Sequence, residues 1–503
     1  MWLRRLSTDR VERRASRPAE APLLVVASVK SALRVAATND AAARLGIRPD
    51  MALADVRAIY PEIEAVDADP PADHALLETV ADWCDRYTPL IGLDPPDGLM
   101  LDTGGCAELF GGERALGRDM LARLSQQGFH VRIGMADTPG AAWAVARRGD
   151  TWWVPPGAAR EVLRPLPLAG LRLGPETVGA LAQAGLKTIG DVMVRPRAPL
   201  AARFGQMLLR RLDQALGEEA ESIQPRLPAP SYLAEQRFAE PIGREDDVLG
   251  TIAQLAGRLE RMLERHGEGA RLLEVSLYRA DGKVARLRAG SGAPLRDPAR
   301  IRALFVERIA VSADECDPGF GFDMVRLSAL AVERMEALQT GLAGKEGEEA
   351  LSHLIDRLCA RFGSRQVTRF VPADTHIPEE AMQSLPAQQV HGASGLPPPG
   401  QDSLVPLRPI RLFEHPEPIE TVAEVPDGPP AKFRWRRVMH EVAVSEGPER
   451  IEMEWWRGDD RKPLPRDYFR VETRDGLRVW LYRQGIYGRS AGAPRWFLHG
   501  LFA

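Results

Sequence analysis

The sequence contains few cysteines and none in a pair that could hold a metal. The four cysteines lie at positions 84, 106, 316 and 359, and no C-x-x-C pair occurs among them. A zinc site or a disulfide framework is therefore not expected, and no other metal site is predicted. Cysteines spaced in this way fit the reducing environment of the cytoplasm.

Long apolar runs are also absent. The longest, such as residues 21–29, fall well short of the roughly 18 apolar residues of a membrane helix. The first residues, Met1 to Arg5, are followed by Asp9 and Glu12 without an apolar core, which does not fit a secretory signal. We therefore expect a cytoplasmic protein without a membrane partner.

Lysine is scarce and the chain is slightly acidic. Lysine occurs only at positions 30, 187, 283, 345, 432 and 462, although lysine and arginine together number 66. The bias is typical of a GC-rich genome, and arginine also suits bidentate contacts with phosphate. The net charge of −4 disfavours a broad DNA-coating role but is compatible with local basic patches.

What the chain does have is the composition of a globular protein. Its 503 residues suggest three or four domains, and 44% of them are hydrophobic. Short apolar runs alternate with helical stretches in residues 1–160, whereas residues 161–225 are helical. Residues 231–340 combine helices with a hairpin, which predicts a sheet with two helices on one face.

The rest of the chain has a different character. Residues 341–385 are predicted to form a helical connector, and residues 386–432 a proline-rich tether. Residues 433–503 are rich in tryptophan and tyrosine and alternate well, which predicts a β-rich module. The expected fold class is therefore α+β with several domains.

Periodicity predicts the individual elements. The expected helices cover residues 36–45, 76–87, 249–263, 301–309 and 351–362. The expected strands cover residues 23–26, 99–101, 131–135, 272–278, 284–287 and 322–330. Asp281 and Gly282 separate two alternating segments, which indicates a β-hairpin.

Residues 88–102 resemble the palm segment of the Y-family translesion DNA polymerases. The Thr-Gly turn and the Leu-Phe-Gly that follow, up to residue 111, belong to the same resemblance. Residues 36–51 resemble the fingers of that family, and residues 134–138 its next palm strand. Residues 186–191 resemble the helix-hairpin-helix of its thumb. The resemblance covers residues 1 to about 340 and implies a right hand. Its parts are a palm and fingers (1–160), a thumb (161–225) and a little finger (231–340).

Several segments narrow the resemblance to the polymerase-like member of a bacterial mutagenesis cassette. These are residues 94–98, 136–143, 408–413, 416–419 and 494–500. This resemblance implies four partners. They are primer-template DNA, the β sliding clamp, a RecA-like accessory protein and the α subunit of an error-prone replicative-type polymerase.

The resemblance also permits a count of catalytic carboxylates. Nucleotide transfer needs two hard divalent ions held by carboxylate oxygens, and active Y-family enzymes supply three such groups. Asp97 matches one of them, but Gly98 replaces the glutamate, and Arg5 lies in the segment that should carry the first-strand carboxylates. No catalytic residue, metal or cofactor is therefore expected. Mg²⁺ would be needed only if the protein were an active polymerase after all.

Neighbouring residues agree with this count. A gapless match places Leu3 and Arg4 beside Arg5 in the first-strand segment. In the fingers it places Asp40 and Ala43 where the family has a tyrosine and an arginine for the triphosphate. Asp94, Asp97 and Asp102 are then expected to make turn and strand-end contacts; the alternative is a weak one-metal site.

The thumb contains the predicted DNA contacts. A helix-hairpin-helix binds phosphate through backbone N–H groups and helix N-termini. Gly170, Arg172, Gly174 and Lys187 are the candidates, since glycine permits close approach of the backbone. The alternative is an ordinary helical hairpin without a DNA contact.

The tether contains a candidate clamp-binding peptide. Gln401, Ser403, Leu404 and Val405 resemble the short motif of bacterial polymerases, in which an amide and apolar anchors enter a groove. The alternatives are a chance match, or an anchor at residues 410–413.

The aromatic residues of the tail are expected to form a core, with stacking on single strands as the alternative.

These predictions support a non-catalytic adaptor that binds DNA and the clamp and recruits an error-prone polymerase. One alternative is an active polymerase of low fidelity. Another is a protein-only hub that does not bind DNA, which the slightly negative net charge permits.

Overall fold

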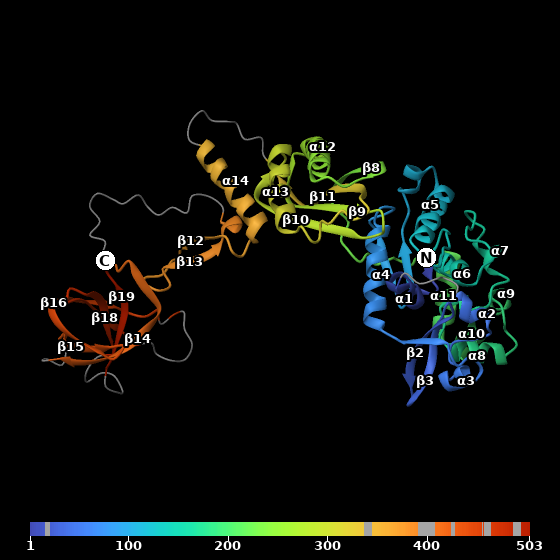
Figure 1. Ribbon diagram of the computed structural model, residues 1–503, viewed down its shortest axis with the longest axis horizontal. Helices are drawn as coiled ribbons and strands as arrows, with labels where there is room; N and C mark the ends of the chain where they lie inside the picture. Colours follow the sequence, from blue (N-terminus) through green and yellow to red (C-terminus); the bar gives the residue numbers. More distant parts are fainter. Residues whose placement is uncertain are drawn as a thin grey trace. The chain divides into compact units, whose positions relative to one another are not determined.

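The computed structural model divides into two units, Met1–Ala343 and Gly344–Ala503, which are considered separately (Figure 1). The structure describes residues 1–15, 21–335, 345–390, 408–423, 428–454, 456, 464–485 and 494–503. None of the helices in these ranges is both long enough and apolar enough to cross a membrane.

The first unit begins with a four-stranded palm sheet. Its order is β5-β6-β1-β7, with bounds Ile91–Asp94, Gly98–Leu101, Trp2–Leu3 and Val131–Arg132. β1 lies between β6 and β7 and is antiparallel to both. Helices α1 (Leu6–Ala15), α4 (Pro70–Cys84) and α5 (Glu113–Gln126) share one apolar core with this sheet. The predicted strands at 99–101 and 131–135 and the helix at 76–87 are present, with shifted ends.

The fingers form a smaller layer beside the palm. Their sheet has the order β3-β2-β4, with bounds Ala32–Thr38, Leu23–Val29 and Glu64–Asp67, and it packs against α2 (Asp40–Arg44) and α3 (Leu53–Ile59). The predicted helix at 36–45 is wrong in its first half, because residues 36–38 belong to β3. Asn39 ends that strand and caps α2, since its side chain accepts a hydrogen bond from the Ala42 N–H at 2.9 Å.

The thumb is helical. It contains α7 (Ala159–Leu163), η2 (Leu168–Leu171), α8 (Pro175–Gln183), α9 (Ile189–Met193), α10 (Arg197–Phe204) and α11 (Gln206–Leu216). These elements share a core with α6 (Pro139–Arg148), the helix that follows the palm strand β7. Thumb and palm are thus joined by a common apolar cluster.

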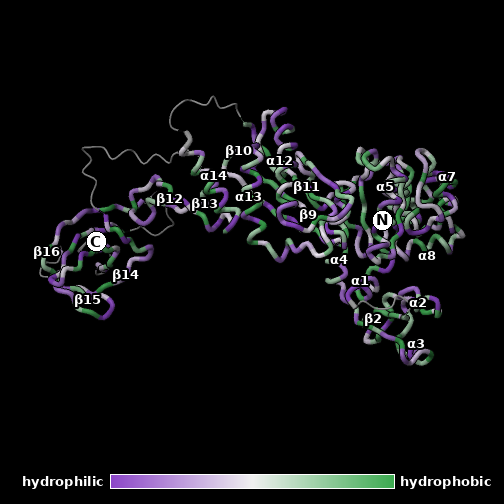
Figure 2. The backbone as a smooth tube through the Cα atoms, turned by 45° about the horizontal axis from the view of Figure 1, so that its top comes forward, coloured by the Kyte–Doolittle hydropathy of each residue, from purple (hydrophilic) through white to green (hydrophobic). Residues whose placement is uncertain are grey.

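The little finger is a four-stranded antiparallel sheet with helices on one face. Its order is β10-β9-β11-β8, with bounds Val284–Leu295, Glu268–Arg279, Phe322–Arg334 and Tyr232–Ile242. Helices α12 (Glu245–His266) and α13 (Pro298–Val311) pack against it, and Figure 2 shows how hydrophobic and hydrophilic residues alternate along α12. The predicted hairpin is confirmed: β9 and β10 pair across Asp281 and Gly282, and Gly282 has a φ of +92°.

The second unit contains a helix, a two-stranded sheet and a closed barrel. Helix α14 (Lys345–Phe362) precedes β12 (Thr368–Pro372) and β13 (Met382–Pro386), and the short η3 (Ala387–Gln389) follows. The barrel consists of β14 (Arg411–Ala423), β15 (Pro430–Trp435), β16 (Val438–Ile451), β17 (Arg466–Thr473), β18 (Arg478–Gln484) and β19 (Arg495–Leu501).

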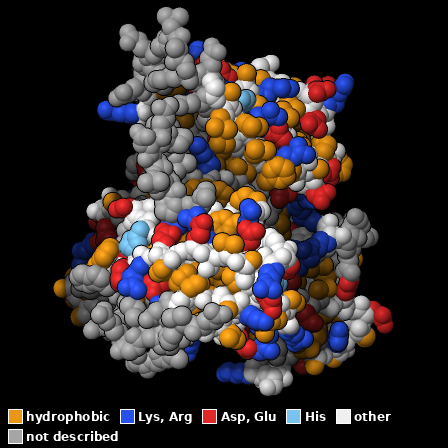
Figure 3. All heavy atoms as spheres, turned by 90° about the vertical axis from the view of Figure 1, so that its left-hand side faces the viewer, with side chains coloured by type: hydrophobic (Ala, Val, Ile, Leu, Met, Phe, Trp, Pro, Cys, Tyr) orange, Lys and Arg blue, Asp and Glu red, His pale blue; other side chains and the backbone are white. Residues whose placement is uncertain are grey.

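The barrel begins earlier than the sequence predicts. The tether was expected over 386–432, but residues 411–423 form β14, which pairs with β15 and also with β19 near the end of the chain. Several aromatic residues of the tail form its core, as expected: Trp480, Tyr468, Phe469 and Phe433 are each at most 1% exposed, whereas Trp456 is 60% exposed. Figure 3 draws one face of the molecule, on which hydrophobic, basic and acidic side chains are interspersed.

Candidate palm site and DNA-contact surfaces

Two palm carboxylates lie at a tight hairpin, Asp97, which was matched to a family carboxylate, and Asp94. Asp94 ends β5 and pairs with Gly98, the first residue of β6, and Asp97 lies in the turn between them. Both carboxylates contact the guanidinium of Arg147 from α6. Its Nη1 donates to Asp97 Oδ1 at 2.9 Å, and its Nη2 donates to Asp94 Oδ2 at 3.1 Å. One arginine therefore forms ion pairs with both acids.

Two tryptophans complete this arrangement. The Trp2 indole N–H donates to Asp97 Oδ2 at 2.8 Å, and that of Trp143 donates to Asp94 Oδ2 at 2.7 Å. The Arg147 guanidinium lies 5.3 Å from the Trp2 ring centroid and 4.6 Å from that of Trp143, which adds cation–π attraction. Asp94 and Asp97 thus each form an ion pair with Arg147, in addition to the turn contacts expected from the sequence.

Gly98, which the sequence analysis matched to a family glutamate, leaves little space for a side chain. A Cβ atom at this position would lie 2.7 Å from Asp94 Oδ2 and 2.8 Å from Arg147 Nη2. Hard divalent ions need carboxylate oxygens that are free to ligate, whereas these oxygens already accept hydrogen bonds from a cation and two indoles. The residues present therefore do not fit a catalytic metal pair, and no reaction step is assigned to one.

The first-strand residue at this site is not Arg5, which corrects the sequence-based assignment. β1 consists of Trp2 and Leu3; Trp2 contacts Asp97, and Leu3 is buried in the palm core. Arg5 lies beyond the strand and forms an ion pair with Asp40 of the fingers. The gapless match could not show this, because it fixes sequence order and not the direction of a side chain.

Asp102 has the role expected from its position. It follows β6, and its Oδ1 accepts a hydrogen bond from the Gly104 N–H at 2.9 Å. This is a local turn contact.

The sequence did not indicate the roles of Trp2, Trp143 and Arg147. Trp143 and Arg147 are spaced at i and i+4, which places both on one face of α6. This spacing was the one sequence feature that could have indicated their shared role.

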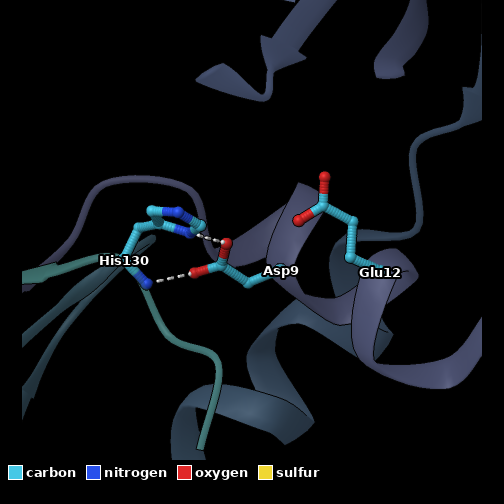
Figure 4. Close-up of side chains that lie close together, drawn as sticks. All are labelled: Asp9, Glu12 and His130. Atoms are coloured by element: carbon cyan, nitrogen blue, oxygen red, sulfur yellow. Dashed lines mark hydrogen bonds and ion pairs between the residues drawn. The ribbon is translucent and has the colours of Figure 1, made fainter. Parts of the chain in front are cut away.

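In the described part of the chain, one group of histidine and acidic residues is close enough to share an ion: Asp9, Glu12 and His130. Figure 4 shows that the Asp9 carboxylate faces two of the three His130 nitrogens; the backbone N lies at 2.8 Å and the ring Nδ1 at 2.7 Å. Glu12 accepts from Asn39 Nδ2 at 2.8 Å. Burial raises the pKa of Asp9, although hydrogen bonds from His130 act against that rise. The group is thus a hydrogen-bonded structural contact between α1 and the residue before β7.

The thumb candidates fall into two groups. Gly170 is buried beside Ala144, and Arg172 forms an ion pair with Glu221 at 2.6 Å, so neither faces solvent freely. Gly174 caps the N-terminus of α8, with open space around its Cα, and Lys187 is exposed. The positive end of a helix dipole, as at Gly174, and an exposed lysine are each suited to a phosphate.

Ionic contacts also join the palm to the little finger, a feature that the sequence analysis missed. The register places Ser276, Arg286 and Arg326 on the sheet face opposite α12 and α13. This face also carries Glu235 and Glu274, and we call it the polar face. Arg326 donates to Glu235 at 2.8 and 3.2 Å, and also to the Asp85 carbonyl at 2.9 Å, just beyond the end of α4.

Further arginines strengthen this junction. Arg286 contacts Asp85, as well as Asp82 at 3.2 Å and Glu274 at 3.0 Å. Arg86 forks onto Asp323 at 2.9 and 3.0 Å. Since Asp85, Glu274 and Ser276 are at most 6% exposed, the centre of the polar face is shielded by the palm.

The clamp-binding candidates Gln401, Ser403, Leu404 and Val405 lie outside the described residues. The rival anchor at 410–413 lies within the described residues. Ile410 is 83% exposed, whereas Leu412 and Phe413 pack against the barrel clusters. Of the apolar residues in the rival anchor, Ile410 is therefore the one that is accessible to a partner.

Comparison with known proteins identifies both halves of the first unit. Residues 10–147 match the impB/mucB/samB family, and residues 229–342 match the C-terminal domain of the same family. Protein ImuB of Caulobacter vibrioides is 40% identical over 91% of this chain and 100% of its own length. DNA polymerase IV of the same species is 26% identical over 56% of this chain and 71% of its length.

Solved structures give weaker matches. DinB from Sulfolobus solfataricus has a TM-score of 0.38 at 15% identity, over 66% of this chain and 98% of its own. A binary complex of Dbh DNA polymerase has a TM-score of 0.40 at 15% identity, with the same coverage. The family matches confirm the resemblance predicted from residues 36–51, 88–111 and 134–138. The chain belongs to the impB/mucB/samB family of Y-family polymerase-like proteins, and within that family it is a relative of Protein ImuB.

Proposed function

We propose that this protein is a non-catalytic adaptor in DNA damage tolerance and induced mutagenesis. The observation that carries the proposal is the Arg147 guanidinium between Asp94 and Asp97, at the place where a polymerase needs free carboxylates. An internal cation with fixed hydrogen bonds already satisfies the acids that a metal would need. The active polymerase stays as the alternative, since Asp97 is retained.

DNA binding is proposed for the thumb. The N-terminus of α8 at Gly174 and the exposed Lys187 lie in the segment that the sequence assigned to a helix-hairpin-helix. Contacts of this kind neutralise phosphates without reading the sequence, so they weaken steeply with salt. Gly170 and Arg172 support the thumb from within, through packing and an ion pair.

A single fluorescent primer-template tests both parts of this proposal. We expect the full chain to shift the primer-template at low salt and to lose affinity as salt rises. We expect no nucleotide incorporation with Mg²⁺ or Mn²⁺, because Arg147 occupies the carboxylates.

An active polymerase of the same family, assayed on the same substrate, is the positive control. Template-dependent extension that disappears in Asp97→Ala would contradict the adaptor proposal. A failure to shift DNA at any salt concentration would favour the protein-only hub.

Clamp binding is proposed for Gln401, Ser403, Leu404 and Val405, in the segment that precedes the barrel. Replacing Gln401 and Leu404 with alanine is expected to abolish capture by an immobilised β sliding clamp, since both the amide and the main apolar anchor are lost. Ile410→Ala is the matched control and should bind like the wild type. The reverse pattern would move the anchor to residue 410.

The remaining partners follow from kinship with Protein ImuB. A RecA-like accessory protein and the α subunit of an error-prone replicative-type polymerase are proposed to bind the second unit. The closed barrel buries its aromatic residues, so a partner would meet its outer surface and not its core. The proposed location is the cytoplasm, at the nucleoid when the protein is engaged with DNA.

A further inference from the structure

A groove of about 330 Å³ runs between α1 and α4 and is lined by three arginines. Arg10, Arg13 and Arg14 form one wall, and the other consists of Ala72, Ala75, Leu76 and Thr79. The arginines stand at i, i+3 and i+4, which places them on the same face of α1. The groove is separate from Asp94, Asp97 and Arg147, and no proposal made above uses it.

Arg10, at the base of this groove, is buried and only partly hydrogen-bonded. Its Nε donates to Asp73 Oδ1 at 2.6 Å, and Ser7 donates to the other oxygen of Asp73 at 2.7 Å, which fixes the carboxylate. The residue is only 8% exposed, yet its Nη2 has no hydrogen-bond partner among the described residues. A buried donor on a charged group that lacks a partner is costly, so an acceptor supplied from outside would be stabilising.

The other two arginines extend the basic wall towards solvent. The Arg13 guanidinium lies 3.9 Å from the Phe129 ring centroid, which orients it before any ligand arrives. Burial lowers the pKa of Arg13, whereas Asp9 and Asp281 act in the opposite direction. Arg14 is exposed. Among the described residues that line the groove none is acidic, and Asp73, which is ion-paired with Arg10, offsets one of the three arginine charges.

The remaining wall and the surroundings decide which anion fits. Ala72, Ala75 and Leu76 offer an apolar strip that a sugar–phosphate backbone would not use. Two exposed acids lie near this wall, Asp69 at the N-cap of α4 and Glu78 beside Thr79, so a long polyanion would meet more repulsion than a short acidic segment would. Three arginines within five residues of helix span only one or two anionic groups.

From these observations we propose that the groove binds a short acidic peptide segment of a partner protein. Its carboxylates would accept charge-assisted hydrogen bonds from Arg10, Arg13 and Arg14, and an apolar side chain between them would contact Leu76. The binding would place a partner on the α1–α4 side of the palm.

Fluorescence anisotropy of the full chain tests this proposal. The probe is a labelled nonapeptide of alternating aspartate and leucine, and the peptide control has asparagine in place of aspartate. We expect the acidic peptide to bind in a salt-dependent manner. Affinity should fall about tenfold in Arg13→Gln/Arg14→Gln and also with the asparagine peptide, since charge-assisted hydrogen bonds are lost. Arg10→Lys, which keeps the charge but loses the fork, should also weaken binding.

The matched control removes the same charge elsewhere. Arg261→Gln/Arg265→Gln changes two exposed arginines of α12 and should bind the peptide like the wild type. The proposal is overturned if the acidic peptide does not bind the full chain. It is also overturned if Arg13→Gln/Arg14→Gln binds the peptide unchanged. Displacement of the peptide by double-stranded DNA, through the same arginines, would assign the groove to nucleic acid instead.

Discussion

Replacing Arg326 with methionine is expected to lower the free energy of unfolding by about 3–5 kcal/mol, the usual effect of leaving a buried charge without its partner. The Arg326 side chain is 9% exposed, and it binds Glu235 through two hydrogen bonds and the Asp85 carbonyl through a third. The substitution leaves Glu235 without its main cation and removes a link between little finger and palm. Urea unfolding of the full chain measures the loss, and hydrogen exchange in peptides from β11 and α4 locates it.

Arg288→Met is the matched control for this substitution. Arg288 lies on the same face of the sheet and contacts Glu274 at 2.8 Å, but its side chain is 54% exposed, so a change of at most about 1 kcal/mol is expected. Equal effects of the two substitutions would show that the junction does not depend on its buried centre.

The same ion pair predicts a pH dependence. Burial acts to raise the pKa of Glu235, but Arg326 and Arg237 hold it below its ordinary value. A carboxyl with a depressed folded-state pKa stabilises the protein above its unfolded pKa, and this contribution is lost as pH falls through the folded pKa. The difference between wild type and Arg326→Met should therefore be largest at neutral pH and should narrow in acid.

The second large effect is expected at the palm. Arg147→Ala leaves Asp94 and Asp97 without their shared cation, and we expect a loss of about 2–3 kcal/mol, towards the lower end for buried pairs because both acids are 27–28% exposed. The freed carboxylates should then attract a hard divalent ion. Millimolar Mg²⁺ or Mn²⁺ should restore part of the stability of the variant, by about 1.4 kcal/mol at ten times the dissociation constant.

Thermal unfolding with and without the ion measures this rescue. Arg148→Ala changes the exposed neighbour on α6 and should show neither the loss nor the rescue. If the wild type gained as much stability from the ion as Arg147→Ala, Arg147 would not be the group that excludes metal from the site.

Much of the first unit could be predicted from local sequence signals. The short segments at 36–51, 88–111 and 134–138 indicated the family because turn residues and apolar runs occur there in a fixed order. The alternation in 272–278 and 284–287 predicted a hairpin, and Asp281 and Gly282 supply the turn that it requires. These features depend on neighbours within a few residues of one another, so one sequence is enough to find them.

The errors arose where distant residues decide the structure. Residues 36–38 resemble a helix in composition, but β3 pairs with β2 and Asn39 ends the strand. Residues 411–423 resemble a tether, but β19 pairs with them from the far end of the chain. Arg5 was placed among the palm positions, whereas its partner is Asp40 of the fingers.

By itself, the sequence determined the family of this protein and predicted that Gly98 stands where the family has a palm glutamate, because both depend on residue order. Only the tertiary structure decided what became of the surviving acids. Arg147 and Trp143 come from α6, some fifty residues after Asp94, and Trp2 comes from β1, so none of their contacts is local. A charge is neutralised by whichever group lies within a few ångströms of it, and that distance is set by the packing of the sheet against the helix.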